Sequence, residues 1–155
     1  MVKNLSVPFS TQQKHGYCLL ACAQMALAHL GISRSQAALA KTLGIFEDFG
    51  VPASNITRLK SSSIEVIYAT EAVLSDVADW FDQKIPVIAF VQTAQLDYWQ
   101  KHPAQHAVLI VAIDNDSVYL LDPARNADIV TVSIAEFLLA WDDMEFSYAV
   151  IRRRV

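Results

Sequence analysis

Two nearly continuous apolar segments, IPVIAFVQ (85–92) and HAVLIVAID (106–114), set the strongest limit on the architecture of this chain. Each has the length of one strand, and neither shows the alternation of apolar and polar residues that marks a strand with one solvated face. Strands of this kind are typical of the centre of a sheet that is covered on both faces. We therefore expect both segments to lie in the interior of such a sheet.

Helical patterns mostly precede these two strands, and further strands follow them. Helices are expected at 18–31, 33–44, about 54–62, 71–83 and 133–143. The remaining strands are expected at 64–69, 117–122, 129–133 and 146–153. Short turns between the later strands favour antiparallel pairing. This order predicts an α+β fold in which N-terminal helices pack on a mostly antiparallel sheet.

Capping residues and apolar spacing give more detailed expectations for the helices. Ser33 and Ser54 are expected to cap the helices at 33–44 and 54–62. Gly31 is expected to end the first helix, because glycine readily adopts the conformation that follows a helix. The helix at 71–83 should bury the apolar side chains of its inward face, Val73, Val77, Trp80 and Phe81.

Composition and charge exclude several classes of protein. The chain has 155 residues, 54% hydrophobic and 18% charged, which fits one folded domain over 1–155 and excludes a disordered chain. The net charge of -4 argues against a nucleic-acid partner, because binding phosphates requires a basic surface. No apolar run is long enough to span a membrane, and the N-terminal segment MVKNLSVPFSTQQ lacks the apolar stretch that a secretory signal needs. Two cysteines are too few for a disulfide scaffold or a metal site, so we expect a cytoplasmic protein with free thiols and no cofactor.

Cys18 stands where a polar, glycine-containing loop gives way to the apolar helix pattern CLLACAQMALAHLG. The N-terminus of a helix stabilises a thiolate, because its unpaired N–H groups and the helix dipole place positive charge there. Lys14 and His15 can add positive charge nearby. Alternatively, Cys18 is a small apolar residue at the start of a buried helix, since free cysteine is often buried. Cys22, one turn further along, is interpreted as a packing residue.

His106 and Asp122 stand at the outer ends of two strand patterns that a turn at Asn115 and Asp116 would join. If these strands pair antiparallel, His106 at the start of the first lies beside Asp122 at the end of the second. A carboxylate beside an imidazole fixes its tautomer and orientation, as in Cys–His–Asp catalysis. Taken singly, His106 can equally be a structural residue at a strand end, and Asp122 a turn former before Pro123.

Gln12 can supply the remaining group that acyl transfer on a thiol requires. The tetrahedral intermediate carries an oxyanion, which the backbone N–H of Cys18 and a side-chain amide from the preceding loop can stabilise. Gln12 and the adjacent Gln13 both offer such an amide. The residues alone therefore leave two candidates for this donor.

The segment VPFSTQQKHGYCLLACAQMAL resembles the start of the papain-like bacteriocin-processing (double-glycine leader) peptidases. Those peptidases have a glutamine six residues before the nucleophilic cysteine and often a second cysteine four residues after it. Gln12, Cys18 and Cys22 occupy these positions. The segments GVPASNITRL, IPVIAFV and VSIAEFLLAWDD are similar to other parts of the family. HAVLIVAIDNDSVYLLDPA resembles its histidine strand and its aspartate–proline hairpin.

This resemblance spans nearly the whole chain and implies a papain-like cysteine peptidase domain, free-standing and without a transporter. It implies four catalytic residues: Cys18 as nucleophile, His106 as base, Asp122 as its orienting residue and Gln12 as oxyanion donor. The substrate would be a peptide or small protein, cut after small residues or a double glycine. Leu19 replaces the glycine that commonly follows the family's cysteine, which bears on that specificity. A thiol amidase or acyltransferase and a non-catalytic peptide-binding module of the same fold are the alternatives.

Overall fold

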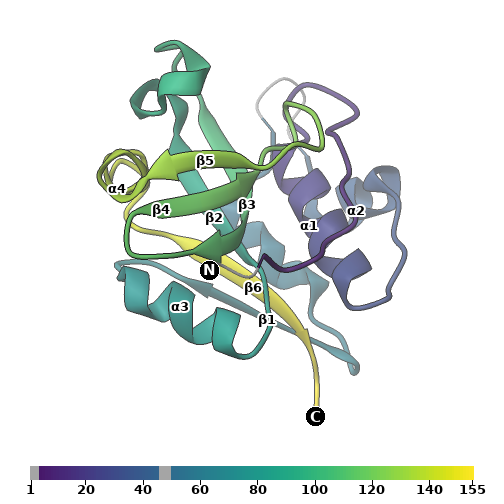
Figure 1. The fold of residues 1–155 in the computed structure, drawn as a ribbon. Coiled ribbons are helices and arrows are strands. Elements are labelled where there is room, and N and C mark those ends of the chain that lie inside the picture. Colours follow the sequence, from purple (N-terminus) through teal and green to yellow (C-terminus); the bar gives the residue numbers. More distant parts are fainter. Residues whose placement is uncertain (1–3, 46–49) are drawn as a thin grey trace.

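The computed structural model describes residues 4–45 and 50–155 and contains a six-stranded sheet (Figure 1). The strands follow the order β1-β6-β2-β3-β4-β5, and each neighbouring pair is antiparallel. Their bounds are β1 (Ile64–Ala69), β2 (Val87–Gln92), β3 (Gln105–Ile113), β4 (Ser117–Leu121), β5 (Val130–Ser133) and β6 (Tyr148–Arg153). β2 and β3 therefore lie inside the sheet, as their apolar sequences predict.

Helices cover both faces of this sheet. One face packs against α1 (Cys18–His29), α2 (Gln36–Leu43) and the 3-10 helix η1 (Ala53–Leu59), and the other against α3 (Leu74–Asp82) and α4 (Ile134–Asp142) (Figure 1). Successive residues of β3 alternate between the two cores, so that Leu109 packs in the first and Ile110 in the second. None of the helices in the described part of the chain is long and apolar enough to cross a membrane. The helices and antiparallel sheet confirm the predicted α+β class.

Helix α1 packs against β3 and is buried along most of its length. It begins at Cys18, after a turn in which the Tyr17 N–H donates to the Lys14 carbonyl oxygen at 3.1 Å. It ends before Gly31, whose φ of 81° is the left-handed conformation that favours glycine. Cys18 thus occupies the first helical position, as the loop-to-helix pattern predicts.

The structure corrects the two predicted helix caps. Helix α2 is capped by Ser35 and not by Ser33, because Ser35 is the extended residue directly before the helix. Its Oγ accepts the Ala38 N–H at 3.1 Å. The helix predicted at about 54–62 is the shorter 3-10 helix η1, which begins at Ala53 and ends at Leu59, so Ser54 stands inside it and does not cap it.

Helix α3 corrects one of the residues expected on its inward face. Val73 is 58% exposed, because it is the extended residue before the helix and its N–H donates to the Asp76 carboxylate at 2.9 Å. Val77 is fully buried, and Trp80 and Phe81 are partly buried against the second core, as the helical spacing predicts.

The connection between β2 and β3 projects from one end of the sheet (Figure 1). It contains two short 3-10 turns, η2 (Thr93–Gln95) and η3 (Asp97–Trp99). The hydroxyl of the buried Thr93 donates to the His102 carbonyl oxygen at 2.7 Å, which joins the two ends of the connection. This closure holds η3 close to the first residues of β3.

Candidate active site

Cys18 lies half-buried at the N-terminus of α1, next to the first residues of β3. Burial alone raises the pKa of its thiol. A hydrogen bond with His106, the imidazole charge, and the backbone N–H groups of Ala107 and Leu19 lower the pKa by more, so it falls below its ordinary value. The thiolate form of Cys18 is therefore favoured in this position.

Cys22 has the opposite character. Its side chain is fully buried, and burial together with the charge of Cys18 raises the pKa of its thiol well above the ordinary value. One helix therefore holds a thiol that ionises readily and, one turn away, a thiol that stays protonated. This fits the interpretation of Cys22 as a packing residue.

His106 and Asp122 form a buried ion pair between the start of β3 and the end of β4. His106 Nε2 lies 2.7 Å from Asp122 Oδ1, and the two residues are 6% and 0% exposed. Burial lowers the pKa of His106, but hydrogen bonds with Asp122 and Cys18 raise it to about 9. Burial raises the pKa of Asp122, but the hydrogen bond and charge of His106 bring it below its ordinary value. The hairpin thus brings the imidazole and the carboxylate together, as the strand pattern predicts.

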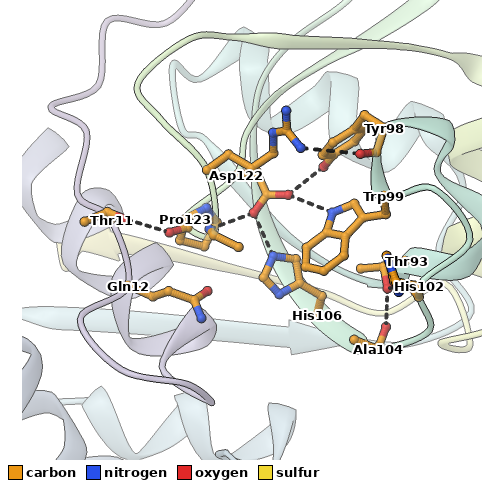
Figure 2. A network of polar contacts seen from close by, with 12 residues as sticks. Thr11, Gln12, Thr93, Tyr98, Trp99, His102, Ala104, His106, Asp122 and Pro123 are labelled. Atoms are coloured by element: carbon orange, nitrogen blue, oxygen red, sulfur yellow. Dashed lines mark hydrogen bonds and ion pairs between the residues drawn. The ribbon is translucent and has the colours of Figure 1, made fainter.

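Two aromatic side chains that no sequence motif indicates also bind Asp122 (Figure 2). The Tyr98 hydroxyl and Trp99 Nε1 donate to Asp122 Oδ2 at 2.7 and 3.1 Å. The Ala124 N–H donates to Oδ1 at 2.9 Å, so with His106 the buried carboxylate has donors on both oxygens. Tyr98 and Trp99 come from η3, outside the β3–β4 hairpin. The only sequence signal for these two residues is that they are adjacent aromatic residues in the loop before β3.

The same two aromatic residues cover the ion pair. The Trp99 ring meets the His106 ring edge-on, with the ring centroids 5.0 Å apart. The guanidinium of Arg125 lies 5.2 Å from the centroid of the Tyr98 ring. Burial and the charge of Asp122 raise the pKa of Tyr98, so its hydroxyl stays protonated and remains a donor. This cover limits the access of water to the carboxylate.

Gln12 lies near the imidazole ring, on the loop that precedes α1 (Figure 2). Its backbone N–H donates to the Pro123 carbonyl oxygen at 2.8 Å, and the Thr11 hydroxyl donates to the same oxygen at 3.0 Å. Its Nε2 lies 3.4 Å from the Lys14 carbonyl oxygen. Its buried Oε1 has no hydrogen-bond partner among the residues that the structure describes.

A cleft of about 690 Å³ brings three of the four predicted residues together, because Gln12, Cys18 and His106 all line it. Asp122 does not line the cleft but holds His106 from the other side of the ring. Gln13 is exposed and does not line it either. Most of the remaining wall is apolar and includes Leu19, Val51, Pro52, Phe90, Trp99 and Met144.

Leu19, the residue after Cys18, contributes to both the core and the cleft. It is 2% exposed and packs in the core between α1 and the sheet. Leu19 is also among the residues that line the cleft. Because almost all of its side chain is buried in the core, the leucine leaves the cleft beside Cys18 open.

The chemistry of this site rests on a thiol with a lowered pKa beside an imidazole with a raised pKa. A carboxylate holds the imidazole, and a side-chain amide lines the same cleft. Within residues 4–45 and 50–155, no three His, Cys, Asp or Glu side chains are grouped as a bound metal ion would require. The arrangement has the components of acyl transfer through a thiol.

Solved structures share this fold, among them the following three. A C39-like peptidase from Bacillus anthracis has a TM-score of 0.80 and 18% identity, over 99% of this chain and 98% of that one. The peptidase domain of Streptococcus ComA, a bifunctional ABC transporter of a quorum-sensing pathway, has a TM-score of 0.70 and 18% identity, over 96% and 97%. A double-glycine-motif protease from an AMS/PCAT transporter, solved with its leader peptide, has a TM-score of 0.69 and 15% identity, over 97% and 94%.

Comparison by sequence gives the family directly. No curated protein matches the chain. The model of the Peptidase_C39 like family, however, matches residues 4–149, which is nearly the whole sequence. This match agrees with the resemblance found in the cysteine, histidine and aspartate segments, and the chain therefore belongs to the Peptidase_C39 like family.

Proposed function

We propose that the protein is a cysteine peptidase in which Cys18 is the nucleophile, His106 the general acid and base, and Asp122 the residue that orients His106. The observation that carries this proposal is the pairing of Cys18 and His106 in one cleft, with His106 Nε2 held 2.7 Å from Asp122 Oδ1. The family and the fold support a cysteine peptidase role. The lowered pKa of Cys18 and the raised pKa of His106 favour a thiolate–imidazolium pair.

The reaction would proceed in two stages. The Cys18 thiolate attacks the carbonyl carbon of the scissile bond, which forms a C–S bond and an oxyanion. His106 then protonates the leaving amine, the C–N bond breaks and a thioester remains on Cys18. In the second stage His106 removes a proton from water and the resulting hydroxide attacks the thioester carbonyl. The C–S bond then breaks, the carboxylic acid product is released, and the thiolate–imidazolium pair of Cys18 and His106 is restored.

Gln12 is the proposed oxyanion donor, together with the backbone N–H of Cys18. Its side chain lines the cleft, and its buried Oε1 has no partner among the described residues. Its Nε2 makes only a long contact of 3.4 Å with the Lys14 carbonyl oxygen. This donor can exchange that weak contact for a hydrogen bond to the oxyanion.

We propose a peptide with small residues beside the scissile bond as the substrate. The cleft has mostly apolar walls, and one solved structure that shares this fold is a double-glycine-motif protease in complex with its leader peptide. Small residues, glycine above all, allow the substrate backbone to approach the sulfur closely. Because Cys18 must remain reduced to react, we place the activity in a reducing compartment such as the cytoplasm.

The experiment is incubation of the wild type and of Cys18→Ala with a mixture of peptides, some of them containing a double glycine, followed by mass spectrometry. Cleavage by the wild type alone is expected. Peptides that bind both proteins and stay intact would indicate a binding module, and turnover of simple amides without peptide cleavage would indicate an amidase. Either of these results contradicts the peptidase proposal.

A further inference from the structure

Gln36, the first residue of α2, has a buried polar side chain on a helix that bears none of the proposed catalytic residues. It is 0% exposed. A primary amide in such a position is costly unless its donors and acceptor are all paired. Its partners therefore show what the residue does in the fold.

Two of the partners of Gln36 are the residues on either side of Gln12. Gln36 Nε2 donates to the Thr11 carbonyl oxygen at 2.8 Å, and Gln36 Oε1 accepts the Gln13 N–H at 3.0 Å. One side-chain amide thus pairs with the backbone before and after Gln12, as a neighbouring strand would. The second N–H of Nε2 donates to Gln24 Oε1 at 2.9 Å, which ties the amide to α1.

The backbone of Gln12 is held from a second direction as well. Its own N–H and the Thr11 hydroxyl both donate to the Pro123 carbonyl oxygen, at 2.8 and 3.0 Å. By contrast, the one hydrogen bond of the Gln12 side chain is a long contact of 3.4 Å with the Lys14 carbonyl oxygen. The position of the Gln12 amide in the cleft is therefore set by its backbone, and Gln36 makes two of the contacts that fix this backbone.

We propose that Gln36 is a positioning residue, which holds the loop at 11–13 so that the Gln12 amide stays at the oxyanion position. This inference rests on the oxyanion role proposed above for Gln12. Gln36 does not line the cleft, so it would act only through the loop at 11–13. Its loss should weaken stabilisation of the oxyanion and leave the ionisation of Cys18 unchanged.

Two reactions of Cys18 separate these effects, and neither requires the natural substrate. In acylation by p-nitrophenyl acetate, the thiolate attacks the ester carbonyl, an oxyanion forms, and the C–O bond breaks to release p-nitrophenolate. In alkylation by iodoacetamide, the thiolate displaces iodide from carbon and no oxyanion forms. The ratio of the two rate constants therefore reports oxyanion stabilisation, and the alkylation rate alone reports the thiolate.

The variant is Gln36→Met, which keeps the length of the side chain and removes all three hydrogen bonds. We expect acylation to slow by about 10- to 100-fold, as a misplaced catalytic group does, with an unchanged alkylation rate and an unchanged pH profile of alkylation. Gln13→Ala is the matched control, because it keeps the backbone N–H that Gln36 binds, and both rates should stay at the wild-type value. Equal losses in acylation and alkylation by Gln36→Met would overturn the proposal.

The double variant Gln12→Ala/Gln36→Met tests whether Gln36 acts through Gln12. It should acylate no more slowly than Gln12→Ala alone, and losses that multiply would contradict the proposal. If Gln36→Met does not fold, as judged by circular dichroism, Gln24→Leu takes its place. It removes one acceptor of Gln36, and a smaller but selective loss of acylation is expected, whereas no loss would overturn the proposal.

The result for Gln12→Ala shows whether a failure lies in the oxyanion role of Gln12 or in the positioning role of Gln36. If this variant leaves the acylation-to-alkylation ratio unchanged, the oxyanion role of Gln12 fails, and the positioning role of Gln36 fails with it. If Gln12→Ala lowers the ratio and Gln36→Met does not, only the positioning role fails.

Discussion

The backbone N–H of Gln12 donates to the carbonyl oxygen of Pro123 at 2.8 Å. Pro123 directly follows Asp122, the residue that binds His106. The loop that bears the proposed oxyanion donor is therefore joined to the turn that bears the carboxylate. A substitution in either segment should therefore change the geometry of the other, and the effects of substitutions in both should not add.

Alkylation should distinguish the two cysteines. At pH 7 iodoacetamide should modify Cys18 faster than a model thiol, because the pKa of Cys18 is lowered, and should leave Cys22 unmodified in the folded protein. Peptide mass mapping would identify the modified residue. Cys22→Ala is the control and should retain the fast reaction, whereas Cys18→Ala should abolish it. Equal modification of both thiols in the folded chain would contradict the assignment of Cys18 as nucleophile.

The two adjacent glutamines should differ sharply in their effect on turnover. Gln12→Ala should lower kcat by about 10²–10³, which is the loss measured for other oxyanion-hole donors. Gln13→Ala should have little effect, because the Gln13 side chain is exposed and does not line the cleft. Steady-state kinetics on a cleaved peptide would measure both. Similar losses for the two variants would show that the oxyanion donor is assigned to the wrong position.

The alkaline limit of activity should depend on Asp122. Protonated His106 must donate to the leaving amine, so activity should fall as the pH rises through the pKa of His106, which is about 9. In Asp122→Asn the charge that raises this pKa is lost and burial continues to lower it, so the alkaline limb should move to lower pH. The pH dependence of kcat/KM for wild type and variant would measure the shift. An unmoved limb would contradict the coupling of His106 to Asp122.

The hydroxyl of Tyr98 should contribute to stability. Tyr98→Phe removes a 2.7 Å hydrogen bond to a fully buried carboxylate, which should lower the free energy of unfolding by about 1–3 kcal/mol. Tyr119→Phe is the matched control, because Tyr119 donates to Asp114 at the same distance but to a carboxylate that is only partly buried, and its effect should be smaller. Urea denaturation would compare the variants. A larger loss for Tyr119→Phe would refute the stabilising role of the η3 aromatic pair.

Specificity is expected to favour small side chains on both sides of the scissile bond. Small residues, glycine above all, let the substrate backbone approach the sulfur of Cys18 closely, so bulky residues at the cut should slow cleavage. A peptide library with randomised residues around the cut would measure the preference. Efficient cleavage after bulky residues would contradict this expectation and leave the thiol mechanism unaffected.

Contacts within one helix or one hairpin could be predicted from the sequence. Helical spacing and the loop before it place Cys18 at the start of α1, and antiparallel pairing across a short turn brings His106 beside Asp122. Both predictions depend on local geometry that repeats in every helix and hairpin. The nearly continuous apolar sequences of β2 and β3 likewise predicted that both faces of these strands are buried, and their residues pack in both cores.

Local capping was less predictable, because several residues of the same chemistry stand close together. Ser35 caps α2 and Ser33 does not, and the difference lies in which serine has the extended backbone directly before the helix. Likewise, Gln12 and Gln13 are adjacent residues of the same type, so their chemistry does not tell them apart. In the fold, Gln12 lines the cleft and Gln13 faces solvent, because the Pro123 and Gln36 contacts fix the loop at 11–13.

The sequence by itself thus determined the order of helices and strands, the place of Cys18 at a helix N-terminus and the pairing of His106 with Asp122. Only the tertiary structure decided that Tyr98 and Trp99 bind Asp122 and that Gln36 binds the loop of Gln12. The physical reason is how far apart in the sequence the two residues of each contact lie. Periodicity and turn geometry specify neighbours within a helix or hairpin, whereas contacts between separate elements form only when those elements pack together.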